Sequence, residues 1–139
     1  MTKFPAQLPH TPLILIVEDD SSTGEVLELA ISQETSYRSL LVTSGQDALA
    51  VLQQTKPDLI ILDYRLPDTT GIELYDQLQS YQELRTIPVV LMSAMERSEE
   101  LEPTITNRPV TRIDKPFELD DFLTTIERLL TNSTTSFPR

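Results

Sequence analysis

Acidic residues directly follow two short apolar segments that have the composition of buried strands. Glu18 and Asp19 follow the run Leu13–Val17, and Asp63 follows the run 59–62. Strands of a parallel sheet that is covered on both faces read as uninterrupted apolar runs, and open α/β sheets bind their ligands at the carboxyl ends of such strands. If both runs belong to one parallel sheet, the three carboxylates meet at one edge of it.

Two further polar side chains extend this predicted cluster. Ser93 follows the apolar run 89–92, and Lys115 follows a weaker strand pattern at 109–113. Clustered carboxylates repel one another, and a bound divalent cation relieves the repulsion. Oxygen ligands without His or Cys suit Mg²⁺, with Mn²⁺ as the alternative, and Mg²⁺ often shares its ligand shell with phosphate. The set therefore predicts phosphoryl transfer onto a carboxylate, with Asp63 as the nucleophile and with Ser93 and Lys115 holding the phosphoryl oxygens.

The elements that would position these side chains alternate between strand and helix. Strands are predicted at Leu13–Val17, 37–43, 59–62, 89–92 and 109–113. Helices are predicted at about 21–34 with Ser21 or Ser22 as N-cap, after the cap Ser44, from Gly71, at 96–102 and at 119–130. This alternation predicts an α/β fold, a doubly wound parallel sheet of five strands. The flavodoxin-like strand order 2-1-3-4-5 is favoured, because the chain lacks the Gly-rich first turn of a dinucleotide fold.

Length and composition limit the classes of function. The 139 residues fit one domain at 13–130, between a Pro-containing leader (1–12) and a polar tail (131–139). A net charge of −11 argues against direct binding of nucleic acid. The chain has no cysteine and one histidine, and no apolar run approaches the roughly 18 residues of a membrane span. The prolines of the leader interrupt any signal-peptide core, so a cytoplasmic location is predicted.

Four stretches of the chain closely resemble the receiver domain of two-component response regulators. They are residues 14–20 (ILIVEDD), 62–71 (LDYRLPDTTG), 88–94 (PVVLMSA) and 115–117 (KPF). The stretches occur in the order and at the spacing that the family has, and the resemblance covers roughly residues 12–130. It implies the (βα)₅ receiver fold, in agreement with the strand pattern.

The resemblance implies a role for each acid of the cluster. Asp63 would accept a phosphoryl group from a phosphohistidine of a sensor histidine kinase or a histidine phosphotransfer protein. Asp19 and Asp63 would bind magnesium through their side chains, and Arg65 would bind it through its backbone carbonyl. Glu18 would reach the metal through a water molecule.

The resemblance also assigns the residues of the phosphoryl pocket and of the switch. Ser93 would hydrogen-bond the phosphoryl group and Lys115 would pair with it, and the family has a cis peptide bond before the residue at Pro116. Three residues before the lysine, the family usually has Tyr or Phe, whose pose reports phosphorylation. This chain has Arg112 there. The hypothesis is that Arg112 serves as the switch by pairing with one of three acids, Glu96, Glu99 or Glu100.

Three functions remain open from the sequence. The first is a stand-alone receiver that catalyses only its own phosphotransfer and dephosphorylation and signals to an unknown downstream protein, with a homodimer as a possible state. The second is a receiver-like adaptor that works without phosphorylation, which the altered residue Arg112 keeps open. The third is a magnesium-dependent phosphohydrolase with an Asp nucleophile, which is disfavoured because the Asp-x-Asp pattern of such enzymes is missing after the first strand.

Overall fold

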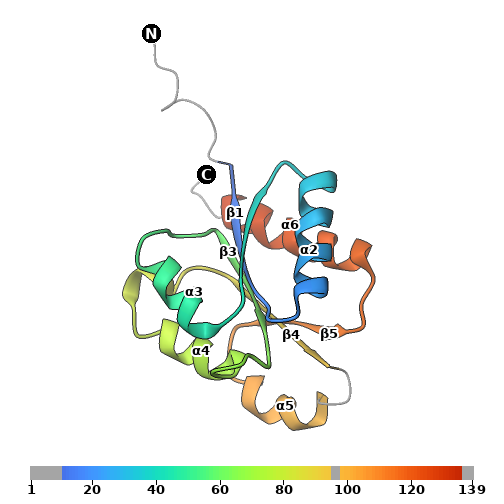
Figure 1. Cartoon of the computed structure of the whole chain (residues 1–139). Coiled ribbons are helices and arrows are strands. Elements are labelled where there is room, and N and C mark those ends of the chain that lie inside the picture. The colour runs from blue at the N-terminus through green and yellow to red at the C-terminus, as the bar shows by residue number, and fades with distance from the viewer. Residues whose placement is uncertain (1–10, 95–97, 136–139) are drawn as a thin grey trace.

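The protein is built on one sheet of five parallel strands. The computed structural model describes residues 11–94 and 98–135, and its strand order, β2-β1-β3-β4-β5, confirms the predicted doubly wound α/β fold (Figure 1). Because the order reverses beside β1, the first and third strands are neighbours. The strands are β1 (Leu13–Val17), β2 (Arg38–Val42), β3 (Leu59–Asp63), β4 (Val89–Ala94) and β5 (Thr111–Lys115).

Helices cover both faces of this sheet. Helices α2 and α6 lie on one face, and α3, α4 and α5 lie on the other (Figure 1). This arrangement follows from right-handed crossovers between parallel strands. The helices are α2 (Ser21–Glu34), α3 (Gly45–Leu52), α4 (Gly71–Leu78), a 3₁₀ turn η1 (Gln82–Leu84), α5 (Ser98–Ile105) and α6 (Leu119–Thr135).

Alternating side chains of the strands divide the core into two apolar layers. All five residues of the central strand β3 are buried, as expected for a strand covered on both faces. Each fully buried Leu or Ile contributes about 1.5–3 kcal/mol, so β3 is a rigid base for the acid at its end. One layer includes Leu15, Val17, Ile60, Leu62 and Leu91, and the other includes Ile14, Ile16, Ile61, Met92 and Phe122.

Several boundaries differ from the sequence-based predictions: β2 is one residue shorter at each end, and β3 and β4 extend to Asp63 and Ala94. The N-cap of α2 is Asp20 rather than Ser21 or Ser22, because the Asp20 carboxylate accepts the Thr23 N–H at 3.0 Å. Strand β5 begins at Thr111 rather than at 109 and runs to Lys115, because its pairing with β4 continues to Ala94. Pro109 has no N–H to give to such a ladder and stays outside it.

The helical boundaries near the carboxyl end of the chain also shift. Helix α5 runs through Pro103 to Ile105, whereas the pattern predicted an end near residue 102. Helix α6 continues to Thr135, past the last residue of the apolar pattern, Leu130. The predicted cis peptide bond between Lys115 and Pro116 is present.

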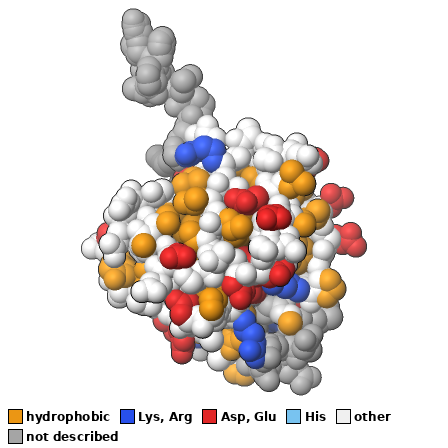
Figure 2. Space-filling model, viewed as in Figure 1, with side chains coloured by type: hydrophobic (Ala, Val, Ile, Leu, Met, Phe, Trp, Pro, Cys, Tyr) orange, Lys and Arg blue, Asp and Glu red, His pale blue; other side chains and the backbone are white. Residues whose placement is uncertain are grey.

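Most of the predicted leader lies outside the described residues, and its last two residues, Thr11 and Pro12, accept hydrogen bonds from Arg38 on the edge strand β2. In the part of the chain that the structure describes, no helix is both long and apolar enough to cross a membrane. Acidic side chains are spread over much of the face drawn in Figure 2, whereas basic side chains gather in few places.

Candidate functional site

Three carboxylates meet where β1 and β3 end. Val17 pairs with Leu62 across the two strands, so the residues that follow Val17 lie beside Asp63. One carboxylate oxygen from each of Glu18, Asp19 and Asp63 falls within 4.8 Å of the other two. The predicted convergence of these acids is therefore confirmed in position. An oxygen-only donor set of this kind suits a hard divalent cation.

Lys115 joins two of these acids from the end of β5. Its Nζ lies 3.0 Å from Glu18 Oε1 and 3.1 Å from Asp63 Oδ1. The second oxygen of Glu18 accepts the backbone N–H of Asp20 at 3.0 Å. Glu18 is 1% exposed and Asp63 is 8% exposed, so water reaches these charges poorly. The lysine neutralises only part of the negative charge. We refer to Glu18, Asp19, Asp63 and Lys115 as the acidic rim.

The excess of negative charge in the acidic rim shifts the pKa values of Asp63 and Lys115. Burial and, after it, the neighbouring Glu18 charge raise the pKa of Asp63 to about 6, although Lys115 acts to lower it. Burial alone would lower the pKa of Lys115, but the charges of Asp63 and Glu18 outweigh it and hold that pKa above its usual value. Lys115 is therefore a fixed cation at neutral pH, whereas Asp63 releases its proton close to neutrality.

An open cleft of about 540 Å³ lies over the acidic rim. Its lining includes Arg65, Leu66 and Pro67 from the loop between β3 and α4, opposite Asp20 and Thr23 of the α2 N-terminus. The cleft is wide enough to admit a hydrated cation together with a phosphoryl group. The loop thus brings Arg65 to the same cleft that Glu18, Asp19 and Asp63 line.

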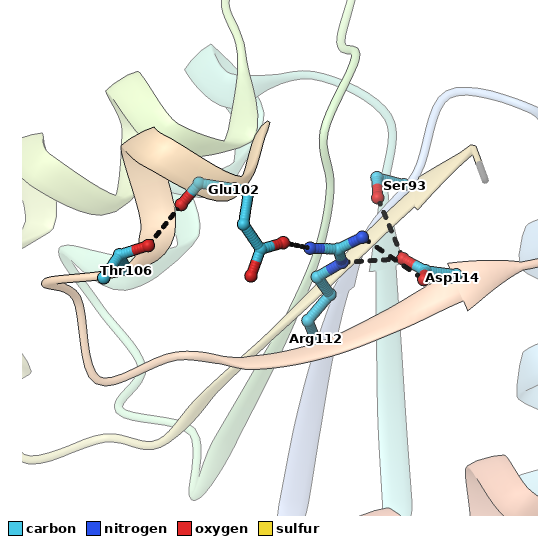
Figure 3. Close-up of polar contacts among 5 residues, drawn as sticks. All are labelled: Ser93, Glu102, Thr106, Arg112 and Asp114. Atoms are coloured by element: carbon cyan, nitrogen blue, oxygen red, sulfur yellow. Dashed lines mark hydrogen bonds and ion pairs between the residues drawn. The ribbon is translucent and has the colours of Figure 1, made fainter. Parts of the chain in front are cut away.

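Ser93 and Arg112 belong to a second polar cluster, one strand further along. Asp63 pairs with Met92, so Ser93 lies one residue past the position beside Asp63. The Ser93 hydroxyl donates to Asp114 Oδ1 at 3.5 Å, the long limit for such a bond. The Nε of Arg112 donates to Asp114 Oδ1 at 2.7 Å. The Nη1 of Arg112 donates to Glu102 Oε1 on α5 at 2.5 Å (Figure 3). We call Ser93, Glu102, Arg112 and Asp114 the Arg112 cluster.

Two members of the Arg112 cluster, Glu102 and Asp114, were not predicted from the sequence. Asp114 could have been found, because residues two apart on a strand point to the same face, and Arg112 and Asp114 stand in that relation. Glu102 could not, because the pattern placed the end of the helix near it and gave no indication of which side it faces. The acids named as partners of Arg112, Glu96, Glu99 and Glu100, have side chains that lie outside the described residues.

Known proteins are similar to this chain in sequence and in fold. The family model of the response regulator receiver domain matches residues 14–127. The polar-differentiation response regulator DivK of Brucella ovis is 30% identical over 120 residues, which cover 86% of this chain and 97% of DivK. The transcriptional regulatory protein BaeR of Escherichia coli O6:H1 is 37% identical over 94 residues, which cover 68% of this chain and 37% of BaeR.

A solved structure of a receiver domain is also similar to this chain. The signal receiver domain of a signal transduction histidine kinase from Syntrophus aciditrophicus superposes with a TM-score of 0.82 at 30% identity, over 93% of this chain and 96% of that chain. Together with these matches, the five-stranded α/β sheet with acids at the ends of β1 and β3 identifies a receiver domain of two-component signalling. The chain belongs to the response regulator receiver family.

Proposed function

We propose that this receiver domain accepts a phosphoryl group on Asp63 from a phosphohistidine of a sensor histidine kinase or a histidine phosphotransfer protein. The observation that carries the proposal is the convergence of Glu18, Asp19 and Asp63 within 4.8 Å, with Lys115 3.1 Å from Asp63. The buried acids leave negative charge uncompensated, and Asp63 faces the open cleft.

The donor atoms of the rim fit magnesium. Asp19 and Asp63 hold it through carboxylate oxygens, the Arg65 backbone carbonyl supplies a third protein ligand, and Glu18 acts through a water molecule. These are all oxygen donors, and three of them already lie close enough to share one ion. Bound Mg²⁺ supplies positive charge to the acids and to the oxygens of the phosphoryl group.

The transfer exchanges one bond for another. A bond forms between phosphorus and a carboxylate oxygen of Asp63 while the P–N bond of the phosphohistidine breaks, and its electron pair returns to the imidazole, which takes a proton from water. Asp63 has to be ionised for this step, which a bound cation favours by opposing the raised pKa. Lys115 then pairs with a phosphoryl oxygen, and the Ser93 hydroxyl donates to another.

The signal leaves through the Arg112 cluster in this proposal. When the Ser93 hydroxyl turns from Asp114 toward the phosphoryl group, Asp114 loses one of its donors and keeps its bonds to Arg112. Because Arg112 also binds Glu102, this change reaches α5. A downstream protein or a second copy of the chain that contacts this face would distinguish the two states. A cytoplasmic location and action by protein contact rather than on nucleic acid complete the proposal.

Intact-protein mass tests the proposal directly. The chain is incubated with acetyl phosphate or phosphoramidate and Mg²⁺, beside Asp63→Ala and the exposed control Asp120→Ala. We expect one phosphoryl adduct in the parent and in the control, none in Asp63→Ala, and none after chelation of the metal. An adduct that persists in Asp63→Ala, or no adduct from either donor or from a phosphorylated kinase, contradicts the proposal and favours the adaptor function.

A further inference from the structure

The loop between β3 and α4 is folded back on itself. The Gly71 N–H donates to the Tyr64 carbonyl at 2.7 Å, and the Leu66 N–H donates to the Thr69 carbonyl at 3.1 Å. Arg65 and Thr70 form an antiparallel bridge between the two arms. These bonds fix the shape of the loop, and none of them joins the loop to α3.

Asp68, at the tip of this loop, binds a different helix. Its Oδ1 accepts the backbone N–H of Gly45 and its Oδ2 accepts that of Gln46, both at 2.9 Å. These N–H groups belong to the first turn of α3, where no partner within the helix is available. The positive end of the helix dipole also favours a carboxylate there. Both bonds lower the pKa of Asp68, so the contact is ionic at neutral pH.

The helix and the loop touch closely at Gly45. A Cβ at this position would lie 2.6 Å from the Thr69 methyl group and 3.5 Å from Asp68 Oδ1. Only a residue without a side chain lets the loop approach the helix this closely. The neighbouring cap of the same helix is independent of the loop, because it is formed by Ser44, whose hydroxyl accepts the Asp47 N–H at 3.0 Å.

We propose that Asp68 is a positioning residue for metal binding, because its anchor on α3 holds the Arg65 backbone carbonyl in the cleft. The inference rests on the proposed function, which supplies the role of that carbonyl. A backbone ligand has no rotamers, so its position depends entirely on the loop that carries it. A loop anchored in advance loses less conformational freedom when the ion binds.

Calorimetric titration with MgCl₂ tests this role on the full chain. In Asp68→Ala we expect the Kd for Mg²⁺ to rise about tenfold, at the low end of what loss of an outer partner of a metal ligand costs. Asp68→Asn keeps one acceptor oxygen and is expected to have a Kd between those of the parent and the alanine variant. Ser44→Ala is the matched control, because it removes the other cap from the same end of α3 and leaves the loop anchored. Its Kd is expected to equal that of the parent, although urea unfolding will show a similar loss of stability.

Two results would overturn the positioning role. One is a folded Asp68→Ala variant with the Kd of the parent, and the other is a Ser44→Ala variant that weakens Mg²⁺ binding as much as Asp68→Ala does. In both cases a parent that binds Mg²⁺ and is phosphorylated leaves the proposed function intact. A parent that shows no heat of Mg²⁺ binding overturns both the metal site and the role of Asp68.

Discussion

The acidic rim and the Arg112 cluster meet on one strand but differ in their access to solvent. Asp114 and Lys115 are consecutive residues of β5, and successive side chains of a strand point to opposite faces, so each serves a different cluster. In the rim, the Glu18 side chain is 1% exposed and that of Asp63 is 11% exposed. In the Arg112 cluster, Glu102 is 67% exposed.

This difference in burial decides what each cluster can do. The rim sets three acids against one lysine, and solvent screens two of these acids, Glu18 and Asp63, poorly, so its energy responds strongly to a proton, a cation or a phosphoryl group. Within the Arg112 cluster, the pair between Arg112 and Glu102 is open to water on the side of Glu102, and ion pairs open to water contribute little to stability. Such pairs can be exchanged at low cost, which suits a contact that has to change between two states.

Loss of the Lys115 charge from the acidic rim is expected to have the largest effect on stability. In Lys115→Met, Glu18 and Asp63 lose their only shared counter-charge among the described residues. Breaking a buried pair in this way lowers the free energy of unfolding by about 3 kcal/mol, the low end of the usual range because the lysine is partly exposed. Urea unfolding at pH 7.5 without Mg²⁺ measures it, with the exposed Lys56→Met as control. A loss below about 1 kcal/mol would show that the rim is solvated like the Arg112 cluster.

The next effect comes from the proton on Asp63. Its pKa is raised from 3.8 to about 6 in the folded state. The folded state thus holds this proton more tightly than the unfolded state, and the stability it provides is complete below pH 3.8 and is lost as the pH rises through 6. Asp63→Asn should remove this loss and raise the free energy of unfolding at pH 7.5 without metal by about 3 kcal/mol. Parallel pH profiles of parent and variant between pH 4 and pH 8 would contradict the raised pKa.

Magnesium is expected to stabilise the fold through the acidic rim alone. Its effect on the free energy of unfolding should be smaller than that of either substitution. At ten times its Kd the ion should stabilise the parent by about 1.4 kcal/mol. The increase should shrink in Asp63→Asn, persist in Arg112→Ala and disappear with a chelator. Shifts in the urea midpoint measure it. A parent midpoint that does not respond to the metal would count against the site.

The smallest effect is expected within the Arg112 cluster. A double-mutant cycle of Arg112→Ala and Glu102→Ala should give a coupling energy of about 0.5 kcal/mol or less, because the Glu102 side chain is 67% exposed. Added salt should reduce it further. Partner binding should weaken in Arg112→Ala while the adduct on Asp63 still forms. A coupling energy above about 1.5 kcal/mol would place this cluster with the rim rather than apart from it.

The parts of the molecule that follow from periodicity were predictable. Uninterrupted apolar runs located β1, β3 and β4, and their alternation with helices gave the strand order that brings Glu18 and Asp19 beside Asp63. The position of the acids of the rim followed because they stand directly after these runs. Local patterns of period two and 3.6 carry this information without any knowledge of distant contacts.

The parts that depend on distant partners were not predictable. Asp68 reads as an ordinary turn residue, and nothing near it indicates that it binds Gly45 and Gln46, more than twenty residues earlier. The strand β5 extends to Lys115 because β4 supplies partners that far, a property of β4 rather than of β5. Asp20 and the two serines after it are equally good N-caps, so only the folded backbone selects between them.

The register of β5 against β4 carries an evolutionary consequence. Ser93 is paired with Asp114 and Ala94 with Lys115. A codon inserted or deleted within β5 would slip the strand by one position and exchange the faces of Asp114 and Lys115. Both clusters would be lost in one event, whereas a codon gained in the turn before Thr111 would leave the pairing intact. Changes in chain length should therefore be tolerated before this strand and eliminated within it.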